Sequence, residues 1–491
     1  MAPKLRPMSM SRDDLAWEEN DNEADSWERS LHKKDLYLAI ASFIKKHRPG
    51  DAVELHKPIR GGYNIFYRLE YKDGSSAALR IPCKGIVRFA EEKCRYEVAT
   101  MRCVAAQTTI PVPKIYHSGT AAENPTGLGP FIIMEYIEHA MTMSDALKDP
   151  ALEPDDYHAL DPNINEQKLE SCYRQMANIV LQLSTIRFPL IGSIVEDKDG
   201  QFSVSGRPLI QNMNSLIEFT GMIPELLPSQ PYSTSKEWFS ALADMHLAQL
   251  TFQHNDAVRD EDDARDKYVA RQLFRQLAAN KRLTPEAELE KNRNNTSLYP
   301  LYSSDLRPSN VLVDKDLCVV GVIDWEFAYA APAQFSYDPP WWLLLRLPEC
   351  WPDGYVDWME TYEPRFKTFL RLLEDEEKTR LSSEIGSSLA NLSLSSDENV
   401  PLSQRMRESW DSKSWMINYA ARNSWEFDFL FWRYFGPSEE GDHHARLGLL
   451  TEKQAEAMEP FVEMKMKESK ERILVQWDNN DAVSHLAKVM V

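Results

Sequence analysis

Apolar and polar residues alternate twice in the first third of the chain, on either side of a short turn. Residues 65–71 and 77–81 each carry an apolar side chain at every second position, and Asp73-Gly74 lies between them. A period of two residues is typical of a strand with one buried face, and Asp-Gly is a favoured hairpin turn. The pattern predicts a β-hairpin over residues 65–81.

The segments around this hairpin complete a sheet-rich region that ends near residue 138. Residues 36–46 have a loose helical period, and the charged segment 85–106 is predicted to be a helix that stops before Pro111. A strand is expected at residues 114–117. The short apolar run 131–137 follows Gly129-Pro130 and fits a buried strand.

Helical periods dominate from about residue 139 onward. Two strand-like segments interrupt them, at residues 310–313 and 317–323, and the turn Asp314-Lys315-Asp316 joins the two. The last long helix is predicted over residues 451–474.

These patterns predict the following organisation of the chain: a disordered tail over 1–30, a sheet-rich part over 31–138, a helical part over 139–440 with a Ser-rich, charged and exposed insertion at 376–404, and a helical extension over 441–491.

Composition excludes several classes of protein. The chain has 491 residues and a net charge of −20, so it lacks the basic surface that nucleic acids and anionic lipids require. No apolar run approaches the ~18 residues that cross a bilayer, and the N-terminus has no signal-peptide pattern. The six cysteines form no Cys-x-x-Cys pair. We therefore expect a cytoplasmic protein with reduced thiols, no nucleic-acid partner and no membrane partner.

One group of polar residues carries recognisable chemistry. Asp305 is followed by Asn310 five positions later and by Asp324 nineteen positions later, with the predicted strand pair in between. Phosphoryl transfer from ATP uses such a set: one carboxylate orients the substrate hydroxyl, while an amide and a second carboxylate hold Mg²⁺. Taken alone, Asp305 and Asn310 are equally compatible with ordinary turn residues.

A second group lies in the sheet-rich part. Arg80 is on the strand face opposite Leu79 and Ile81, so its cation is directed towards whatever the loop 60–64 covers. Glu97 on the following helix is placed to pair with Arg80. The plainer interpretation makes Arg80 a surface strand residue and Glu97 one of many helix charges.

The order of motifs resembles that of the aminoglycoside phosphotransferase family, and fungal members in particular. The matching segments are Gly-Gly-Tyr-Asn at 61–64, Leu-Arg-Ile-Pro at 79–82, Ile-Met-Glu-Tyr-Ile at 133–137, Asp-Leu-Arg-Pro-Ser-Asn at 305–310 and Gly-Val-Ile-Asp-Trp-Glu at 321–326. The resemblance covers roughly residues 50–440. It implies an α+β, protein-kinase-like bilobal fold, with a small β-rich N-lobe and a larger helical C-lobe.

The resemblance also implies roles for individual residues. Asp305 is similar to the catalytic aspartate, and Asn310 and Asp324 match the Mg²⁺ ligands. Arg80 stands where the family has a lysine that touches the α and β phosphates of ATP, and Glu97 is its ion-pair partner. The remaining nucleotide-binding residues that the resemblance implies are Gly61, Gly62, Tyr63 and Asn64 over the phosphates, and Glu135, Tyr136 and Ile137 in the hinge beside adenine.

Three departures from the family pattern leave alternatives open. Ser303-Ser304 replaces the usual His-Gly before the catalytic aspartate, Arg307 and Ser309 replace a His and a Gly, and Arg80 replaces the lysine. We expect an ATP- and Mg²⁺-dependent kinase of a small-molecule hydroxyl, weakened by the missing His. The alternative is a non-catalytic pseudokinase that binds a nucleotide or a protein, and a protein kinase is a third possibility.

The acceptor is not readable from the sequence. The acidic run Asp260 to Asp263 would suit a cationic acceptor, but we favour a solvated helix start as its explanation. The choice between ATP and GTP and the oligomeric state also stay open.

Overall fold

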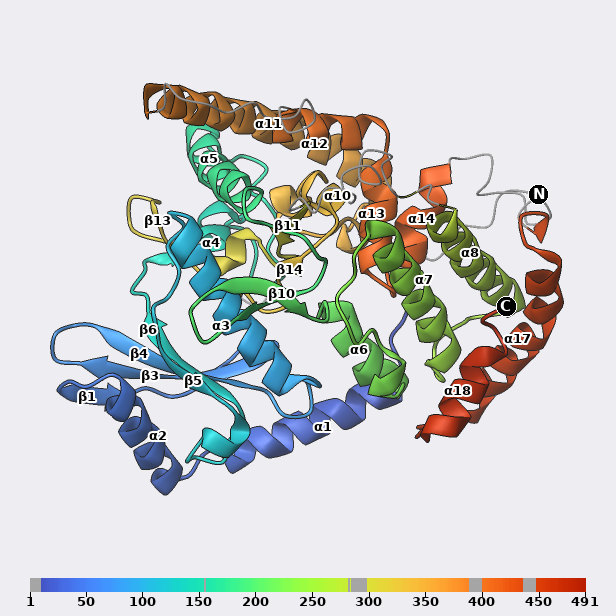
Figure 1. Cartoon of the computed structure of the whole chain (residues 1–491), viewed down its shortest axis with the longest axis horizontal. Helices are drawn as coiled ribbons and strands as arrows, with labels where there is room; N and C mark the ends of the chain where they lie inside the picture. Colours follow the sequence, from blue (N-terminus) through green and yellow to red (C-terminus); the bar gives the residue numbers. More distant parts are fainter. Residues whose placement is uncertain (1–9, 154–155, 281–282, 284–297, 388–399, 436–446) are drawn as a thin grey trace.

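The computed structural model describes residues 10–491, except 154–155, 281–282, 284–297, 388–399 and 436–446. A small sheet-rich lobe adjoins a larger helical lobe, as Figure 1 shows. This is the α+β, protein-kinase-like bilobal arrangement that the resemblance implies, so the predicted fold class is confirmed. In the described part of the chain, no helix is both long enough and apolar enough to cross a bilayer.

One antiparallel sheet of six strands forms the small lobe. The strand order is β1-β3-β4-β6-β5, and β2 pairs with the first residues of β3. The strands are β1 (Ala52–Leu55), β2 (Ile59–Arg60), β3 (Asn64–Tyr71), β4 (Ser76–Pro82), β5 (Ile115–Gly119) and β6 (Phe131–Tyr136). The strands predicted near 114–117 and 131–137 are therefore confirmed as β5 and β6.

Strands β3 and β4 form the predicted hairpin, with Ile65 opposite Ile81 and Phe66 opposite Arg80. The alternate apolar residues of β3 are buried, as the two-residue period requires, and they contact helix α2 (Lys34–His47). Gly74 in the turn has a φ of +81°, a left-handed backbone that glycine adopts without steric strain.

Helix α3 (Ala90–Gln107) covers the other face of the sheet, where Cys94 and Val98 pack against Ile132. The helix begins five residues later than predicted. Gly85, at a φ of +88°, lies in the turn 84–86 and is so close to α1 (Asp14–Ser30) that a Cβ would be 2.9 Å from the backbone nitrogen of Ala24.

The large lobe is mainly helical, and one extended cluster of buried apolar residues runs through it from Met10 to Val489. Its described helices of more than three residues, apart from the 3₁₀ turns, are α4 (Met143–Leu147), α5 (Glu166–Leu183), α6 (Gln211–Thr220), α7 (Ser235–Phe252), α8 (Glu261–Ala279), α10 (Ala333–Ser336), α11 (Gly354–Ser387), α12 (Leu402–Asp411), α13 (Ser414–Arg422), α14 (Phe427–Phe435), α17 (Glu452–Glu471) and α18 (Asn479–Ala487). Helix α17 confirms the helix predicted over 451–474.

Short strands form three small sheets in this lobe. They are β7 (Met141–Thr142) with β12 (Val311–Val313) and β13 (Val319–Val322); β8 (Arg187–Phe188) with β11 (Tyr299–Tyr302) and β14 (Tyr329–Ala330); and β9 (Ser193–Glu196) with β10 (Phe202–Gly206). The predicted pair 310–313 and 317–323 is thus β12 and β13, except that Asn310 itself ends a 3₁₀ turn that begins at Pro308.

Two expectations about loose segments need correction. The disordered tail predicted over 1–30 is wrong for residues 14–30, which form α1. Asp13 caps this helix by accepting from the backbone N–H groups of Leu15 and Ala16. The insertion predicted over 376–404 is helical up to Ser387, because α11 continues to that residue. Residues 1–9 and 388–399 lie outside the described part.

Candidate active site

The loop after β11 carries Asp305, and short contacts within the loop fix this side chain. The Asn310 amide nitrogen Nδ2 donates to the Asp305 backbone carbonyl at 2.8 Å and to its Oδ2 at 2.9 Å. Arg307 Nε lies 3.0 Å from Oδ1. Burial raises the pKa of Asp305 to about 6, although Arg307 opposes the shift. The loop therefore holds a carboxylate that is still mostly ionised at neutral pH.

The hairpin β12–β13 brings Asp324 back beside Asn310. The backbone N–H of Ile323 donates to the carbonyl of Asn310 at 2.9 Å, which joins the two ends of the hairpin. Asp324 has a φ of +59°, a left-handed backbone that is rare for a residue with a Cβ. The packed hairpin holds this conformation and places the Asp324 side chain against the small lobe.

Arg80 of β4 meets Asp324 across the two lobes. Arg80 Nη2 lies 2.6 Å from Asp324 Oδ1, and Nη1 donates to Glu97 on α3. The Arg80 and Glu97 side chains are 6% and 1% exposed, whereas that of Asp324 is 32% exposed. The expected Arg80–Glu97 ion pair is confirmed as a contact, and Arg80 is no surface strand residue.

Two charged residues that the sequence analysis did not assign complete this buried cluster. Glu326 Oε2 accepts from Arg80 Nη2 at 3.2 Å, and it also pairs with Lys93 of α3. Lys93, with a side chain 0% exposed, lies 3.8 Å from Glu97. Burial alone raises the pKa of Glu326, but Lys93 and Arg80 bring its net pKa below the ordinary value.

The loop Gly61–Asn64 is fastened to the large lobe through its last two residues. The Asn64 side-chain amide donates to Glu326 at 2.8 Å and accepts from Lys93 at 2.6 Å. The Tyr63 hydroxyl accepts from Gln211 at 2.9 Å, and the Tyr63 ring packs edge-on against Phe327. A Cβ on Gly62 would meet nothing within 4 Å, so the turn borders open space.

The predicted hinge lies at the end of β6, where the chain passes to the large lobe. The backbone N–H of Glu135 is already bonded to Lys114, at 2.8 Å, and the carbonyl of Ile137 accepts from His139 if the Nδ1 atom of that ring carries the proton. A Cβ on Gly321 would lie 2.6 Å from Ile137 Cδ1, so the hinge touches the strand that leads to Asp324. The Tyr136 ring faces the Arg68 guanidinium at 4.4 Å.

The model of the phosphotransferase enzyme family matches residues 56–336, which is more than half of the chain and contains every predicted site residue. The chain belongs to this family.

Curated relatives match parts of this phosphotransferase-family chain. The subtelomeric hrmA-associated cluster protein of Aspergillus fumigatus is 28% identical over 146 residues, 30% of this chain and 25% of that protein. The mitochondrial "Altered inheritance of mitochondria protein 9" of Zygosaccharomyces rouxii is 32% identical over 179 residues, 34% of this chain and 27% of that protein. These matches span about a quarter of each relative. Among solved structures, an ethanolamine kinase of Plasmodium vivax is 12% identical with a TM-score of 0.38, covering 86% of this chain and 82% of that one.

Ser303 and Ser304 stand where the family resemblance leads us to expect His-Gly. Ser304 follows Ser303 directly after β11, and the bonds from Asn310 to the carbonyl and carboxylate of Asp305 hold the loop from its other side. The hydroxyl of Ser309 is buried and has no hydrogen-bond partner among the described residues. Within the loop 303–310, Asn310 and Arg307 are therefore the residues that hold Asp305.

Two hollows in the structure could take a ligand. A small one of about 80 Å³ lies beside the Asp305 loop, and its lining includes Ser303, Leu306, Trp341 and the Asp338–Arg422 ion pair, which is 2.7 Å long. Its mostly apolar lining suits the body of an organic acceptor.

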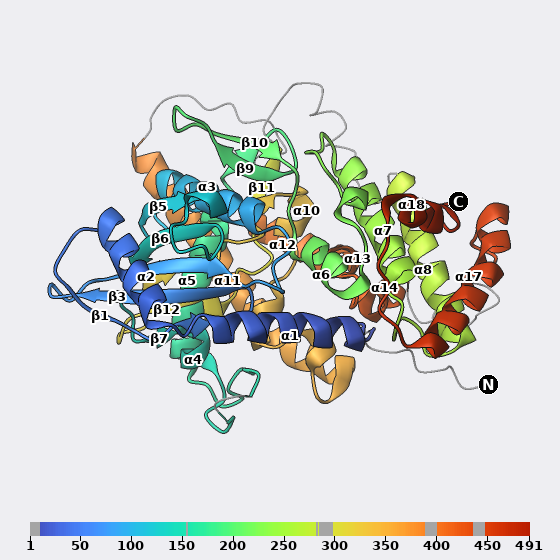
Figure 2. The same ribbon diagram turned by 90° about the horizontal axis from the view of Figure 1, so that it is seen from below.

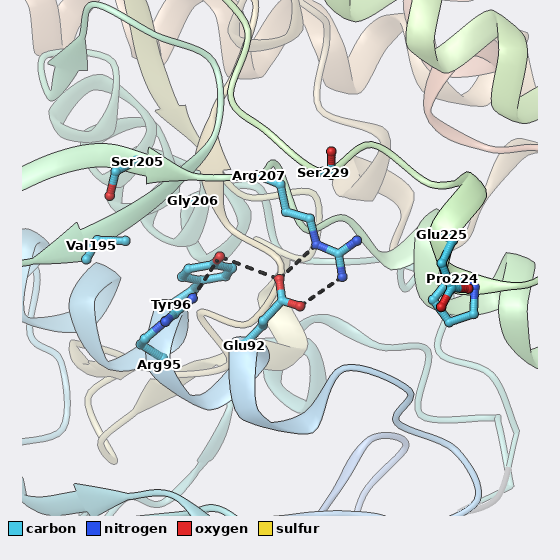
Figure 3. Close-up of a pocket in the computed structure, with 10 residues that line it drawn as sticks. All are labelled: Glu92, Arg95, Tyr96, Val195, Ser205, Gly206, Arg207, Pro224, Glu225 and Ser229. Atoms are coloured by element: carbon cyan, nitrogen blue, oxygen red, sulfur yellow. Dashed lines mark hydrogen bonds and ion pairs between the residues drawn. The ribbon is translucent and has the colours of Figure 1, made fainter.

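The second hollow, of about 540 Å³, lies between α3, strands β9 and β10 and the segment 224–229, as Figure 3 shows. Arg207 spans it and binds both carboxylate oxygens of Glu92, at 2.8 and 2.9 Å. Its lining includes none of the predicted site residues, so we do not assign the nucleotide to it.

The acidic run at 260–263 has a structural role. Asp260 caps helix α8, and Asp263 forms an ion pair with Lys267 at 2.9 Å, in agreement with the simple helix-start interpretation. The run therefore provides no argument for a cationic acceptor.

Proposed function

We propose that this protein transfers the γ-phosphoryl group of ATP to a hydroxyl of a small molecule, with Mg²⁺ as the metal. The observation that carries the proposal is the chain of contacts from Asp305 through Asn310 to Asp324 and on to Arg80. Phosphoryl transfer needs these groups together, because its catalysis rests on positioning and on charge stabilisation rather than on covalent chemistry.

The donor atoms fit a hard divalent cation. The side-chain nitrogen of Asn310 donates to Asp305, so the amide oxygen is the atom of this side chain that could bind a metal ion. Asp324 is the most exposed of the three carboxylates around Arg80. Within the described residues, no group of three or more His, Cys, Asp or Glu side chains is arranged around a metal position. Asn310 and Asp324 would thus hold the ion with phosphate and water oxygens as further ligands, which is the usual Mg²⁺ arrangement.

The residues of the chain divide the remaining work. A bound magnesium–ATP complex supplies the phosphoryl group and most of the charge neutralisation. Asp305 orients the acceptor hydroxyl and accepts its proton, a role that suits a carboxylate with a pKa of about 6. Arg80 presents a guanidinium to phosphate oxygens, and Glu97 and Glu326 fix its orientation.

Two substitutions test the proposal directly. Asp305→Asn and Asp324→Asn should each reduce ADP release by at least about 100-fold, measured with a metabolite library that contains amino alcohols, sugars and apolar alcohols. Asp316→Asn is the matched control, because it changes an exposed turn carboxylate in the same hairpin. Unchanged turnover in either site variant, with a normal melting temperature, would contradict the proposal.

A pseudokinase remains the second candidate, and Ser303-Ser304 at the usual His-Gly position is the observation that favours it. A melting-temperature titration with the analogue AMP-PNP separates the two candidates. Stabilisation that needs Mg²⁺ shows that the chain binds a metal–nucleotide complex, because a ligand that binds only the folded state raises stability, and ADP release with a member of the library then identifies a kinase. Stabilisation without any ADP release from the whole library supports the nucleotide-binding pseudokinase.

A further inference from the structure

Helix α1 is anchored to the large lobe at its N-terminal end. Both carboxylate oxygens of Asp13 lie 2.9–3.0 Å from the side-chain amide of Asn255, and the backbone N–H of Met10 donates to the Trp425 carbonyl at 2.8 Å. Halfway along the helix, the Asn20 side chain donates to the carbonyl of Glu218 in α6 at 2.7 Å. These bonds join α1 to three separate parts of the large lobe.

The C-terminal end of the same helix is anchored to the small lobe. Leu31, directly after the helix, lies in the apolar core of the small lobe, and Trp27 packs against that core. Arg60 Nη1 lies 3.0 Å from Asp25 Oδ1 and 2.7 Å from Glu28 Oε2. Figures 1 and 2 both show α1 running from the sheet to α6, so one helix spans the two lobes.

Arg60 is the residue directly before the Gly61–Asn64 loop. The loop is therefore held on one side by α1, through Arg60, and on the other by the large lobe, through Tyr63 and Gln211 at the start of α6. Because α6 is itself bonded to α1, the three contacts form a closed frame around the loop. A loop held in this way loses less conformational freedom when a ligand binds beneath it.

We propose that α1 is a brace that sets the position of the Gly61–Asn64 loop over the nucleotide, with Arg60, Asp25 and Glu28 as positioning residues. The inference rests on the proposed function, because it assigns the loop to the phosphates of ATP. The brace acts through the loop and touches no reacting atom. Its loss should therefore weaken nucleotide binding and leave the turnover at saturating ATP nearly unchanged.

Charge reversal gives the sharpest test in the full-length protein. Arg60→Glu places three carboxylates together, and the triple variant Arg60→Glu/Asp25→Lys/Glu28→Lys restores opposite charges in the same places. The control is Lys57→Glu, which makes the same change in charge at an exposed position three residues earlier. All the exchanged side chains are partly exposed, so the protein should fold in each case.

Two quantities are measured for each variant. They are the hydrogen-exchange rate of the backbone amides of residues 59–66 without nucleotide, and the Kd of magnesium AMP-PNP. Because the ion pairs of Arg60 are partly exposed, we expect Arg60→Glu to raise the exchange rate and the Kd by about twofold to fivefold each. Both quantities should return towards the wild-type values in the triple variant, and Lys57→Glu should change neither. Exchange that stays at the wild-type rate in Arg60→Glu, or an effect that the triple variant does not reduce, overturns the brace.

The two measurements also separate the brace from the proposed function. If the wild-type protein binds no magnesium AMP-PNP, the proposed function is wrong, and so is the nucleotide part of the brace. The exchange data then still decide whether α1 orders the loop. If the wild type binds and Arg60→Glu binds equally well, only the brace is wrong.

Discussion

Lys93 is the most buried charge of the candidate site, and its removal makes the strongest prediction about stability. Its side chain is 0% exposed and donates to Glu326 and, at 2.6 Å, to Asn64. Lys93→Met keeps most of the unbranched side chain but removes the charge and the N–H groups that bond Glu326 and Asn64. A buried side chain stays charged only when oppositely charged or polar partners stabilise it, because an isolated buried ion is strongly unfavourable.

The charges of the cluster set the expected magnitude. The wild-type cluster has two cations, Arg80 and Lys93, and three carboxylates, Glu97, Asp324 and Glu326. Lys93→Met leaves one cation for three carboxylates, and loss of one partner of a buried pair lowers the free energy of unfolding by about 3–5 kcal/mol. Glu326→Gln leaves two cations for two carboxylates and keeps an acceptor for Lys93. We expect it to cost only about 1–2 kcal/mol.

Equilibrium unfolding in urea measures the free energy of unfolding of each variant and so checks this order of stability. The unfolding is monitored by circular dichroism and by tryptophan fluorescence, and the two midpoints must coincide for a single free energy to apply. The double variant Lys93→Met/Glu326→Gln should be more stable than Lys93→Met alone, since it also removes one of the excess carboxylates. A larger loss in Glu326→Gln than in Lys93→Met would refute the reasoning from charge balance.

Two further predictions concern packing and pH. Gly206→Ala should lower the free energy of unfolding by about 1–3 kcal/mol, because its Cβ would lie 2.6 Å from the Tyr96 ring, while Gly62→Ala, with open space around it, should be neutral in the same urea assay. Burial raises the pKa of Glu349, whose carboxylate accepts from Tyr419 at 2.7 Å, from 4.5 to about 7. The folded protein then holds this proton more tightly than the unfolded chain, so stability should fall by about 3 kcal/mol between about pH 4.5 and 7. Glu349→Gln should remove that part of the pH dependence, and an unchanged slope would contradict this assignment.

The sequence predicted the part of the site that depends on short-range order. The hairpin β12–β13 has a turn of few residues, so the separation of Asn310 and Asp324 along the chain already required the two to meet. Arg80 and Glu97 could be paired in the same way, because an alternating strand and the helix that follows it can face each other in few ways. Local periodicity placed these residues on their strands and helix, and the resemblance to the phosphotransferase family then gave them their roles.

Helix α1, Lys93 and Glu326 could not be found by the same reasoning. The sequence of α1 is polar, with Asn20 and Ala24 as its buried residues, and its position depends on Asn255 and Trp425, more than 200 residues away. Lys93 stands four positions before Glu97, which is the spacing of an ordinary surface pair on a helix. Only the packing of α3 against the Asp324 segment turns it into a buried contact.

The charge of the cluster also bears on how an acidic chain could bind an anionic nucleotide. With a net charge of −20 and one carboxylate more than cations around Arg80, the free site repels phosphate groups. Asp324 is the carboxylate that a dissolved ion reaches most easily, since the other two are almost fully buried. A divalent cation held there would reverse the local balance from one excess negative charge to one excess positive charge. Nucleotide affinity should therefore depend on the metal far more strongly than the simple presence of Arg80 suggests.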